Sequence, residues 1–394
     1  RHDGMTGFSA FSIYTFILRQ GFVMVRPVTH TLLRSLSSRC VDGLPETMRA
    51  VHIRTVGSNG GPEALEMLTN LPLPWTELTP TSVLVRVRAA GVNRPDVLQR
   101  RGLYPPPPGH SPLPGLEVSG TIVAAGAAVQ LSGGGNGGES LDLALGDEVC
   151  ALTNGGGYAE YCAVDVGACL RLPASSSLCA VEAACVPETF CTVWHNVYRQ
   201  CNAFSESLLD RPSPSLLVHG GSSGIGTAAI AMGTALGVDV YATAGSDAKV
   251  EACLKLGAKD AFNYHDTARW DEALREVRGG DGVDLVLDMV GPSYLSRNLA
   301  ALKEGGRVAM IGMQGGHTFP AVGEGERAVS LAALLSRRLS VGGATLRPLP
   351  TAAKTAIVSD LRDQLWTRAA VDGEVPVVID STFDLEHASD AHRR

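Results

Sequence analysis

The sequence predicts a two-domain α/β protein, in which a β-rich domain is followed by a doubly wound parallel sheet with helices on both faces. The chain of 394 residues is too long for one small core and fits two domains with an extension. From Met48 to about Pro173, short β segments alternate with Gly and Pro turns. From about Leu178 to Val341, strand-like and helix-like segments alternate, as they do in a doubly wound sheet.

The start of the chain is an extension with its own composition. Between Met24 and Cys40 there are three arginines, several Ser and Thr, and no acidic residue before Asp42. This composition resembles an organellar transit peptide, which would place the protein in a mitochondrial or other organelle matrix. Alternatively, the natural chain starts at Met48, the upstream residues come from an over-extended gene model, and the protein is cytoplasmic. Both interpretations stay open.

The β-rich domain has its clearest strand in the segment SVLVRVRAAGVN. Alternation of apolar and charged residues predicts a half-buried strand, with one face made by Val83, Val85 and Val87 and the other by Arg86 and Arg88. EVSGTIVAAG and AEYCAV predict two more strands. Between them, LSGGGNGGES (residues 131–140) is a low-complexity segment, which we expect to be an exposed insertion without function.

The doubly wound domain contains the strand-like segments SLLVHGG, DVYATAG, DAFNY, VDLVLDMVG and GRVAMIGMQG, separated by helix-like segments. After it come one helical segment and the strand-like VPVVID (Val375–Asp380), and we expect this end of the chain to pack back onto the first domain. The predicted division is an extension at 1–47, a β-rich domain at 48–177, a doubly wound domain at 178–343 and a returning segment at 344–394.

The first strand of the doubly wound domain leads into a glycine-rich turn within LLVHGGSSGIGTAAI. Gly221 and Gly226 occupy the outer positions of a G-x-G-x-x-G pattern, and Ser223 occupies the middle one. Such a turn presents backbone N–H groups and a helix N-terminus to a pyrophosphate. The predicted dinucleotide cradle consists of Gly221, Ser222, Ser223, Gly224, Ile225 and Gly226.

An alternative is that this turn only packs the helix against the strand without binding a ligand. If the turn is a cradle, we expect Gly226→Val to abolish nucleotide binding while leaving the protein folded.

Composition excludes several classes of partner. The net charge of −7 and the pI of about 5.8 argue against a nucleic-acid-binding surface, which is normally basic. No apolar stretch is long enough for a membrane span. None of the nine cysteines forms a C-x-x-C motif, which indicates reduced thiols of an intracellular protein and no cysteine-rich zinc lobe.

GGSSGIG also fits the glycine fingerprint of short-chain dehydrogenases, which use a Tyr-x-x-x-Lys pair as acid and base. No tyrosine here has a lysine four residues later: Ala268 follows Tyr264 at that distance, and Asn298 follows Tyr294. The short-chain interpretation therefore fails.

The order of motifs instead resembles the medium-chain dehydrogenase/reductase superfamily, and within it the zinc-free, zeta-crystallin-like quinone oxidoreductases. The resemblance runs from about Met48 to His392 through GVNRPDVLQRRGLYPPPP, PGLEVSG, GDEVCAL, GGGYAEYCAV, PETFCTVWH, GSSGIGTAA and LDMVG. The serine in the middle of the glycine turn is shared with the tumour-suppressor-inducible group. The resemblance implies a GroES-like catalytic domain and a Rossmann-type nucleotide-binding domain.

The resemblance also implies a site without metal. Zinc alcohol dehydrogenases of the superfamily have a Cys ligand where this chain has Asn93, and a His ligand where it has Leu116. Neither side chain is a normal zinc ligand, and Glu117 alone cannot hold the ion. Without a Lewis acid, alcohol oxidation is disfavoured, and the site suits a quinone or another electrophilic small molecule.

Further site residues follow from the same resemblance. It places Asn93 and Tyr104 as catalytic residues facing the nicotinamide and substrate, Thr192 near the nicotinamide amide, and Gly312 and Met313 in a loop beside the ring. Alternatives are that Asn93 caps a loop, Tyr104 packs on the following prolines, Thr192 lies on a helix surface and Met313 fills the core.

Cofactor preference depends on the end of the strand in DVYATAG. An NAD site places an acidic residue there, whereas this strand ends near Gly245 and Ser246, with Lys249 close behind. The resemblance adds Tyr264 as a contact of the 2′-phosphate. These four residues predict NADPH; Asp247 opposes the prediction, and Lys249 could alternatively be only a solvated helix residue.

The sequence thus predicts a homodimeric, NADPH-dependent quinone oxidoreductase that transfers hydride directly without zinc. The alternatives are an enoyl-thioester reductase and a low-turnover, crystallin-like NADPH-binding protein. Relatives normally continue past EHASDAHRR through another helix and strand, so we expect either that the C-terminus at Arg394 is truncated or that the end of the sequence is misassigned.

Overall fold

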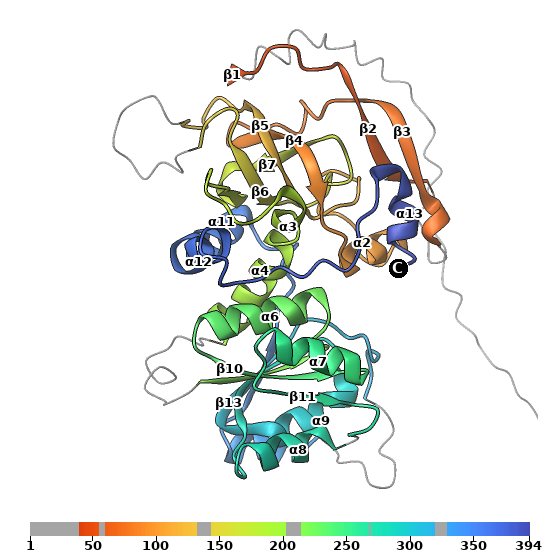
Figure 1. The fold of residues 1–394 in the computed structure, drawn as a ribbon. Helices are drawn as coiled ribbons and strands as arrows, with labels where there is room; N and C mark the ends of the chain where they lie inside the picture. Colours follow the sequence, from red (N-terminus) through yellow and green to blue (C-terminus); the bar gives the residue numbers. More distant parts are fainter. Residues whose placement is uncertain (1–38, 55–59, 132–142, 202–213, 268, 320–328) are drawn as a thin grey trace, which may run out of the picture.

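The structure is a computed structural model that describes residues 39–54, 60–131, 143–201, 214–267, 269–319 and 329–394. The chain forms two lobes, one with an antiparallel sheet and one with a parallel sheet between helices (Figure 1). This arrangement confirms the predicted α/β fold class. The extension up to residue 38 and nearly all of the predicted insertion lie outside the described residues, so both expectations stay predictions.

The first lobe contains, within the described residues, a six-stranded sheet with the order β7-β4-β5-β6-β8 and with β1 beside β5. All neighbouring strands run antiparallel, and β2 and β3 form a separate antiparallel pair. The bounds are β1 Arg39–Cys40, β2 Thr47–Ile53, β3 Leu65–Pro72, β4 Ser82–Ala90, β5 Glu117–Ala125, β6 Glu148–Leu152, β7 Tyr161–Asp165 and β8 Cys169–Arg171.

Strand β4 is only partly the half-buried strand that its alternation predicts. Arg86 and Arg88 are exposed as expected, but Leu84 is as fully buried as Val83 and Val85. The reason is that apolar clusters cover both faces of the strand at its start, one containing Val83 and Val85 and the other Leu84. The first half of β4 is therefore a core strand.

Strand β1 lies ahead of Met48, where the sequence suggests that the domain starts. It pairs with the end of β5, and the N–H of Val41 donates to the carbonyl oxygen of Val123 at 2.9 Å. Val41 and Leu44 also pack against the cluster around Met48. The first lobe thus includes residues from 39 onward.

The second lobe contains, within the described residues, a six-stranded parallel sheet with the order β11-β10-β9-β12-β13-β14. The strand order reverses between β9 and β12, and ligands of doubly wound sheets bind at the carboxyl ends of the strands beside such a point. The bounds are β9 Ser215–His219, β10 Asp239–Ala244, β11 Asp260–Asn263, β12 Val283–Asp288, β13 Leu302–Met310 and β14 Ser340–Gly343.

Helices cover both faces of the parallel sheet because its central strands are apolar on both sides. Leu216 and Val218 of β9 face the cluster that includes α6, whereas Leu217 faces the cluster that includes α8 and α9. Figure 1 shows α6 and α7 on one side of the sheet and α8 and α9 on the other. The bounds are α6 Gly224–Ala235, α7 Asp247–Lys255, α8 Trp270–Val277, α9 Pro292–Ala301 and α10 Leu331–Ser336.

The regular secondary structure of the returning segment (residues 344–394) is helical. It contains α11 (Thr351–Leu361), the π-helix η4 (Arg362–Trp366), α12 (Thr367–Ala370) and α13 (Ala388–Ala391). The prediction of a strand at Val375–Asp380 is wrong, because this stretch is extended but pairs with no described strand.

The end of the returning segment contacts the first lobe. The ring nitrogens of His392 lie 3.0 Å from the hydroxyl of Tyr158 and 3.0 Å from Nη1 of Arg100.

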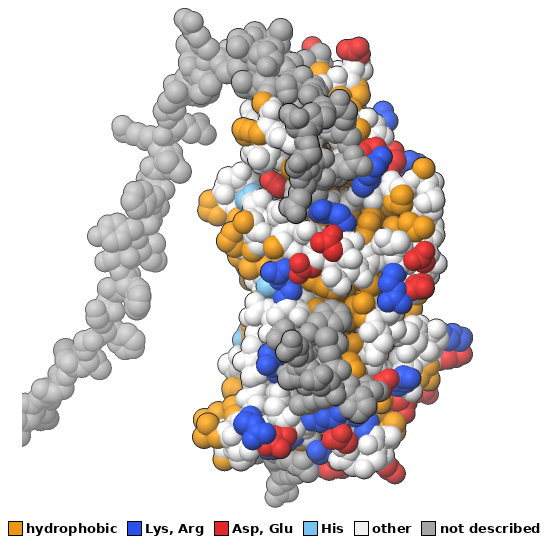
Figure 2. Space-filling view, turned by 90° about the vertical axis from the view of Figure 1, so that its left-hand side faces the viewer, with side chains coloured by type: hydrophobic (Ala, Val, Ile, Leu, Met, Phe, Trp, Pro, Cys, Tyr) orange, Lys and Arg blue, Asp and Glu red, His pale blue; other side chains and the backbone are white. Residues whose placement is uncertain are grey.

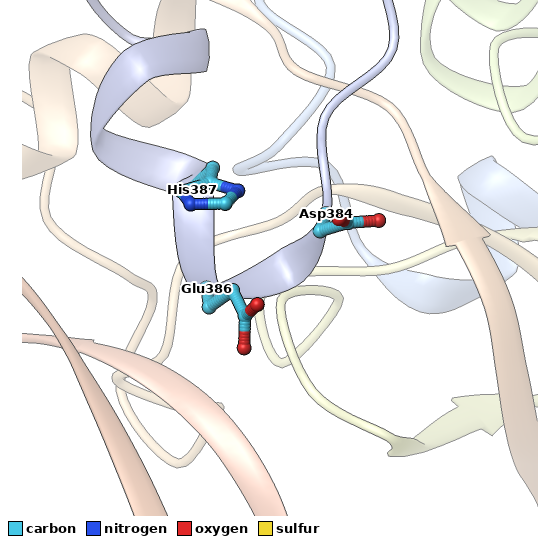
Figure 3. A group of neighbouring side chains, drawn as sticks. All are labelled: Asp384, Glu386 and His387. Carbon is cyan, nitrogen blue, oxygen red and sulfur yellow. The ribbon is translucent and has the colours of Figure 1, made fainter.

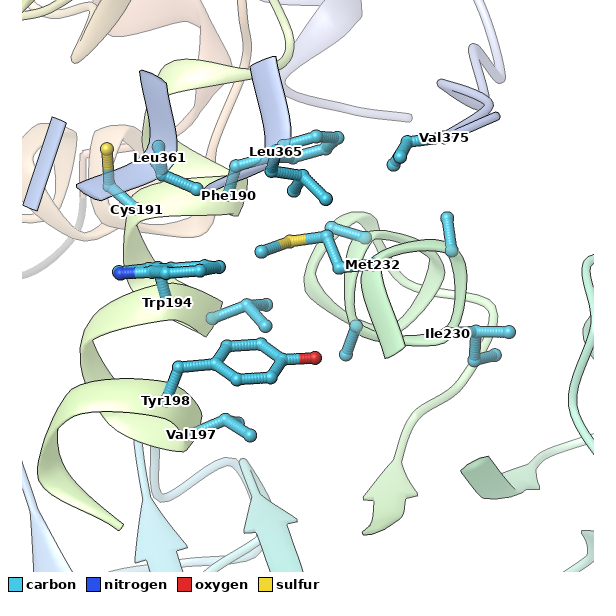
Figure 4. Close-up of a cluster of buried hydrophobic side chains, with 14 of the residues drawn as sticks. Phe190, Cys191, Trp194, Val197, Tyr198, Ile230, Met232, Leu361, Leu365 and Val375 are labelled. Atoms are coloured by element: carbon cyan, nitrogen blue, oxygen red, sulfur yellow. The ribbon is translucent and has the colours of Figure 1, made fainter. Parts of the chain in front are cut away.

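One apolar cluster joins the two lobes. It packs Phe190 of α4 (Pro187–Val193) and Trp194 of the following π-helix η3 (Trp194–Gln200) together with Met232 of α6 and Leu361 of α11 (Figure 4). All four side chains are buried. This cluster fixes α4, which follows the short helix α3 (Ala180–Ala183), against the helix that begins at the glycine turn.

The described surface is mixed in charge on the face that Figure 2 shows, with Lys and Arg interspersed among Asp and Glu. None of the helices in the described part of the chain combines the length and the hydropathy that a membrane span needs.

Candidate active site

The glycine turn between β9 and α6 is closely packed at Gly220, Gly221 and Gly226, where a side chain would meet neighbouring atoms. Gly220 has a φ of +64°, which favours glycine. A Cβ on Gly226 would lie 2.6 Å from the backbone of Gly221 and closer still to the carbonyl oxygen of Gly220. The expectation that Gly226→Val leaves the protein folded is therefore wrong, because the valine would collide with backbone atoms.

Ser223 replaces the middle glycine without strain. Its φ of −78° and ψ of 167° are ordinary for any residue, and its Oγ accepts a hydrogen bond from the N–H of Gly226 at 3.1 Å. The serine thereby caps α6. A Cβ on Gly224 would have as its nearest neighbour only Cγ2 of Thr189, at 3.6 Å. The glycine turn therefore leads directly into the first turn of α6, and the two together include Ser222 and Ile225. They form a helix N-terminus of the kind that binds phosphate.

The residues predicted to choose the cofactor meet beyond the end of β10. A Cβ on Gly245 would lie 2.5 Å from the hydroxyl oxygen of Tyr264, so the tyrosine lies directly over this glycine. Ser246 caps α7 by accepting from the N–H of Lys249 at 3.4 Å, and the lysine is exposed. The carboxylate of Asp247 accepts a hydrogen bond from the amide of Asn263 at 2.9 Å. This bond engages the carboxylate of Asp247, whose charge opposes the NADPH prediction, and the same amide also donates to Asp266.

The loops after β12 and β13 run side by side. The N–H of Gln314 donates to the carbonyl oxygen of Met289 at 3.0 Å, and a Cβ on Gly312 would lie 3.1 Å from the same oxygen. Met313 is 47% exposed, so the alternative that it fills the core is wrong. The predicted nicotinamide loop is thus an exposed edge beside the glycine turn, since Met289 also contacts Ser223.

A hydrogen-bonded chain that the sequence did not reveal supports this edge. The fully buried ring of His219 lies 2.9 Å from Oγ1 of Thr243 and 2.7 Å from Oδ1 of Asn298. Asn298 donates to Asp288 at 3.0 Å, and Asp288 accepts from the N–H of Val290 at 2.7 Å. Burial lowers the pKa of His219, which keeps the ring neutral. These hydrogen bonds fix the carboxyl ends of β9, β10 and β12 relative to one another.

In the first lobe, Asn93 is the N-cap of α2 (Arg94–Arg100), and its side chain is held by a buried carboxyl group. Its N–H donates to Asp96 at 2.9 Å, and its Nδ2 donates to Oε1 of Glu117 at 2.7 Å. The other oxygen of Glu117 accepts from the N–H of Glu188 in α4 at 2.8 Å. Glu117 therefore joins α2 to α4, and Asn93 is a helix cap whose amide also reaches this buried carboxyl.

The other two predicted nicotinamide-side residues, Tyr104 and Thr192, lie on different segments of the chain. Tyr104 is half-buried and lies under the guanidinium of Arg347, 5.4 Å from the ring centroid. Thr192 is half-buried on α4, and its carbonyl oxygen accepts from the side chain of Asn196 at 3.0 Å. The α4 residue that approaches the glycine turn is Thr189, one turn earlier. The role of Thr192 stays a prediction.

Ionisable side chains gather in the interior between these segments. Burial raises the pKa of Asp96 to about 6, that of Glu188 to about 7 and that of Glu117 to about 8. Burial also lowers the pKa of Lys354 to about 8, and Arg347 beside it is 4% exposed. Only Glu117 stood out in the sequence. The others come from α2, α4 and the returning segment, and no local sequence motif indicates that they lie close together.

The buried carboxyl of Glu117 should make stability depend on pH. Its pKa rises from an ordinary 4.5 to about 8, so the folded state binds more protons between these values. The free energy of unfolding should therefore fall as the pH rises from about 5 to 8, by up to roughly 1.4 kcal/mol per pH unit. Glu117→Gln should remove this part of the slope, as measured by urea unfolding at pH 5.5 and 8.

The control is Glu160→Gln. Hydrogen bonds from Arg49 lower the pKa of Glu160, so this group titrates below the tested range and the variant should keep the wild-type slope. An unchanged slope in Glu117→Gln would contradict an elevated pKa at Glu117.

One group of metal-binding residue types occurs elsewhere among the described residues. Asp384, Glu386 and His387 place ligand atoms within 4.8 Å of one another (Figure 3). All three are exposed, and they lie in the returning segment rather than beside Asn93. They are not part of the candidate active site.

Comparisons with known proteins agree with this geometry. Residues 79–174 match the family described as the alcohol dehydrogenase GroES-like domain, and residues 224–358 match the zinc-binding dehydrogenase family. A quinone oxidoreductase from Lama guanicoe is 32% identical over 269 residues, which are 68% of this chain and 74% of that protein.

Two solved structures share the fold. An NAD-dependent alcohol dehydrogenase is 30% identical with a TM-score of 0.68, covering 88% of this chain and 95% of the other. The quinone oxidoreductase of Thermus thermophilus, solved also as a complex with NADPH, is 28% identical with a TM-score of 0.64, covering 89% and 95%. The chain therefore belongs to the medium-chain dehydrogenase/reductase superfamily and, within it, to the quinone-oxidoreductase-like family.

Proposed function

We propose that the protein is an NADPH-dependent quinone oxidoreductase that passes a hydride directly to a quinone or another electrophilic small molecule. The observation that carries the proposal is the hydrogen bond between Asn93 and Glu117. It stands where zinc alcohol dehydrogenases hold their metal, and it engages the carboxyl group of Glu117 with an amide. A site built this way favours an acceptor that needs no Lewis acid. The quinone oxidoreductases among the relatives support the same activity.

The residues of the site then have distinct tasks. The turn from Gly221 to Gly226 binds the pyrophosphate, and Gly245, Ser246, Lys249 and Tyr264 surround the 2′-phosphate. NADPH supplies the hydride when it is bound. Asn93, Tyr104, Thr192, Gly312 and Met313 orient the nicotinamide and the acceptor, and water supplies the proton. Positioning two reactants contributes much of the rate enhancement, so no single acid or base is required.

The activity is tested by following NADPH oxidation with 1,2-quinones, 1,4-quinones and an enoyl-CoA. Turnover with quinones is expected. Turnover only with the enoyl-CoA would identify an enoyl-thioester reductase, and binding of NADPH without turnover would identify a crystallin-like protein. Because one similar structure is an NAD-dependent alcohol dehydrogenase, an assay with NAD⁺ and alcohols completes the set. Alcohol oxidation would overturn the proposal.

The proposal includes independence from zinc. Glu117 already accepts hydrogen bonds at both oxygens, and Leu116 is an apolar, buried residue. Purified protein is expected to contain less than about 0.1 zinc per chain by elemental analysis and to keep its activity in chelators, since two of the usual ligands are missing. Tightly bound, stoichiometric zinc that is lost in Glu117→Gln would contradict this.

The proposal also includes a homodimer. β14 is the edge of the parallel sheet, all of its residues are exposed, and Leu331 and Leu335 of the neighbouring α10 are 71% and 83% exposed. An exposed edge strand beside apolar side chains readily pairs with a second copy.

Light scattering should give wild-type protein about twice the 41.2 kDa of one chain. Leu335→Glu should shift the protein to the monomer mass, and Val277→Glu, at an exposed apolar residue on α8, should not. A monomeric wild type would refute the dimer.

A further inference from the structure

Arg347 binds three segments of the first lobe at once. Its Nη1 donates to the carbonyl oxygen of Tyr104 at 3.1 Å, and its Nη2 donates to Oε1 of Gln99 at 2.8 Å. Nε and Nη2 both donate to the carbonyl oxygen of Asn154, at 3.1 and 2.6 Å. The guanidinium is thus engaged on every side, and its residue is only 4% exposed.

Lys354 holds the backbone of Arg347 in place. Its ammonium donates to the carbonyl oxygen of Arg347 at 2.7 Å and also to the side chain of Asn154. Both cations follow β14, the last strand of the parallel sheet, whereas Gln99, Tyr104 and Asn154 belong to the first lobe. The pair therefore ties the sheet that carries the nucleotide site to the segment that carries Tyr104.

This arrangement specifies where the ring of Tyr104 lies. The cation over the ring attracts its π face, and the hydrogen bond to the carbonyl oxygen fixes the backbone from which the ring projects. The positive charge is balanced by the buried carboxyls of Asp96 and Glu188, whose pKa values it lowers against the effect of burial. Burying a cation is costly, and packing alone would be served as well by an apolar side chain.

We propose that Arg347 is a positioning residue that acts through Tyr104, holding the tyrosine ring at the place where the acceptor binds. The inference rests on the proposed function, because it takes Tyr104 as part of the acceptor site. Arg347 forms no bond to the glycine turn or to the residues around the 2′-phosphate among the described contacts. Its loss should therefore affect the acceptor and not the cofactor.

The test is a double-mutant cycle with Arg347→Met and Tyr104→Leu. Arg347→Met, which keeps an unbranched apolar stem and removes the charged guanidinium with its donors, should lower kcat/KM for the quinone about ten- to a hundredfold, as expected when a reactant is misplaced. The KM for NADPH should stay within about twofold. In the Tyr104→Leu background, Arg347→Met should change kcat/KM for the quinone less than about twofold, because the tyrosine that Arg347 positions is absent.

The matched control is Arg368→Met, which removes an exposed guanidinium that pairs with Glu374 and should leave all constants unchanged. If Arg347→Met does not fold, Arg347→Lys replaces it, since a lysine keeps the charge but cannot form the forked contacts. Two results would overturn the inference and leave Arg347 as a structural residue. One is that Arg347→Met lowers kcat/KM for the quinone equally with Tyr104 and with Leu at this position, and the other is that it raises the KM for NADPH as much as the KM for the quinone.

Amide hydrogen exchange separates this inference from the proposed function. Exchange at Leu103 and Tyr104 should be faster in Arg347→Met than in wild type, and unchanged in Arg368→Met. If wild type reduces no quinone but this exchange difference is found, the proposed function fails while the contact to Tyr104 stands. If exchange at these amides does not change, Arg347 does not hold Tyr104, whatever the substrate is.

Discussion

Gly226→Val is expected to destabilise the protein by about 3 kcal/mol or more and to abolish NADPH binding as a consequence, because overpacked sites with backbone strain give the largest mutational effects. The turn is closed at this point, with the backbone of Gly221 2.6 Å from where the Cβ would lie. No flexible side chain can move aside. Urea unfolding followed by circular dichroism, together with NADPH binding measured by fluorescence, would show both losses.

Gly224→Ala is the matched control within the same turn. Its Cβ would have only an ordinary contact, at 3.6 Å from Cγ2 of Thr189, so stability is expected to stay within about 1 kcal/mol of wild type. A stable, nucleotide-binding Gly226→Val variant would show that the turn is not closed as described here.

Lys249→Ala is expected to raise the KM for NADPH about ten- to a hundredfold and to leave the KM for NADH nearly unchanged. NAD and NADP share the pyrophosphate that the glycine turn binds, so discrimination depends on the groups near the 2′-phosphate. A charge-assisted hydrogen bond from lysine to phosphate contributes roughly 1.5–3 kcal/mol, and each 1.4 kcal/mol changes affinity about tenfold. Steady-state kinetics with both cofactors would measure the effect.

Salt and a second lysine provide the controls. Lys249 is exposed, so its effect should shrink as ionic strength rises. Lys255→Ala changes a lysine of the same helix that pairs with Glu251 at 2.7 Å, and it should leave both KM values unchanged. An equal weakening of both cofactors by Lys249→Ala would make the lysine a structural residue and remove the main support for NADPH.

Asn263 shows why this region could be predicted only in part. The sequence places Asp247 between Ser246 and Lys249, where its charge should repel a phosphate. In the structure the amide of Asn263 donates to that carboxylate from the end of β11. This contact depends on the register of two parallel strands and on the start of α7, which no local pattern contains.

The sequence by itself determined the features that depend on neighbouring residues. The apolar run of β9, the glycines that follow it and the alternation of strands and helices predicted the parallel sheet, the turn at Gly221 to Gly226 and the fold class. These patterns are reliable because burial on two faces and a closed turn restrict which residues are allowed at each position. Where both faces of a strand are covered by distant segments, as at Leu84 of β4, the local pattern was misleading.

The tertiary structure alone decided which distant side chains meet inside the site. The amide of Asn93 reaches Glu117, Arg347 reaches Tyr104, and neither contact has a signal in sequence spacing. A buried ionisable group is stabilised by partners that can come from any segment the fold brings within hydrogen-bonding distance. The stretch Val375–Asp380 illustrates the same limit, because a strand exists only where another strand offers an edge with which to pair.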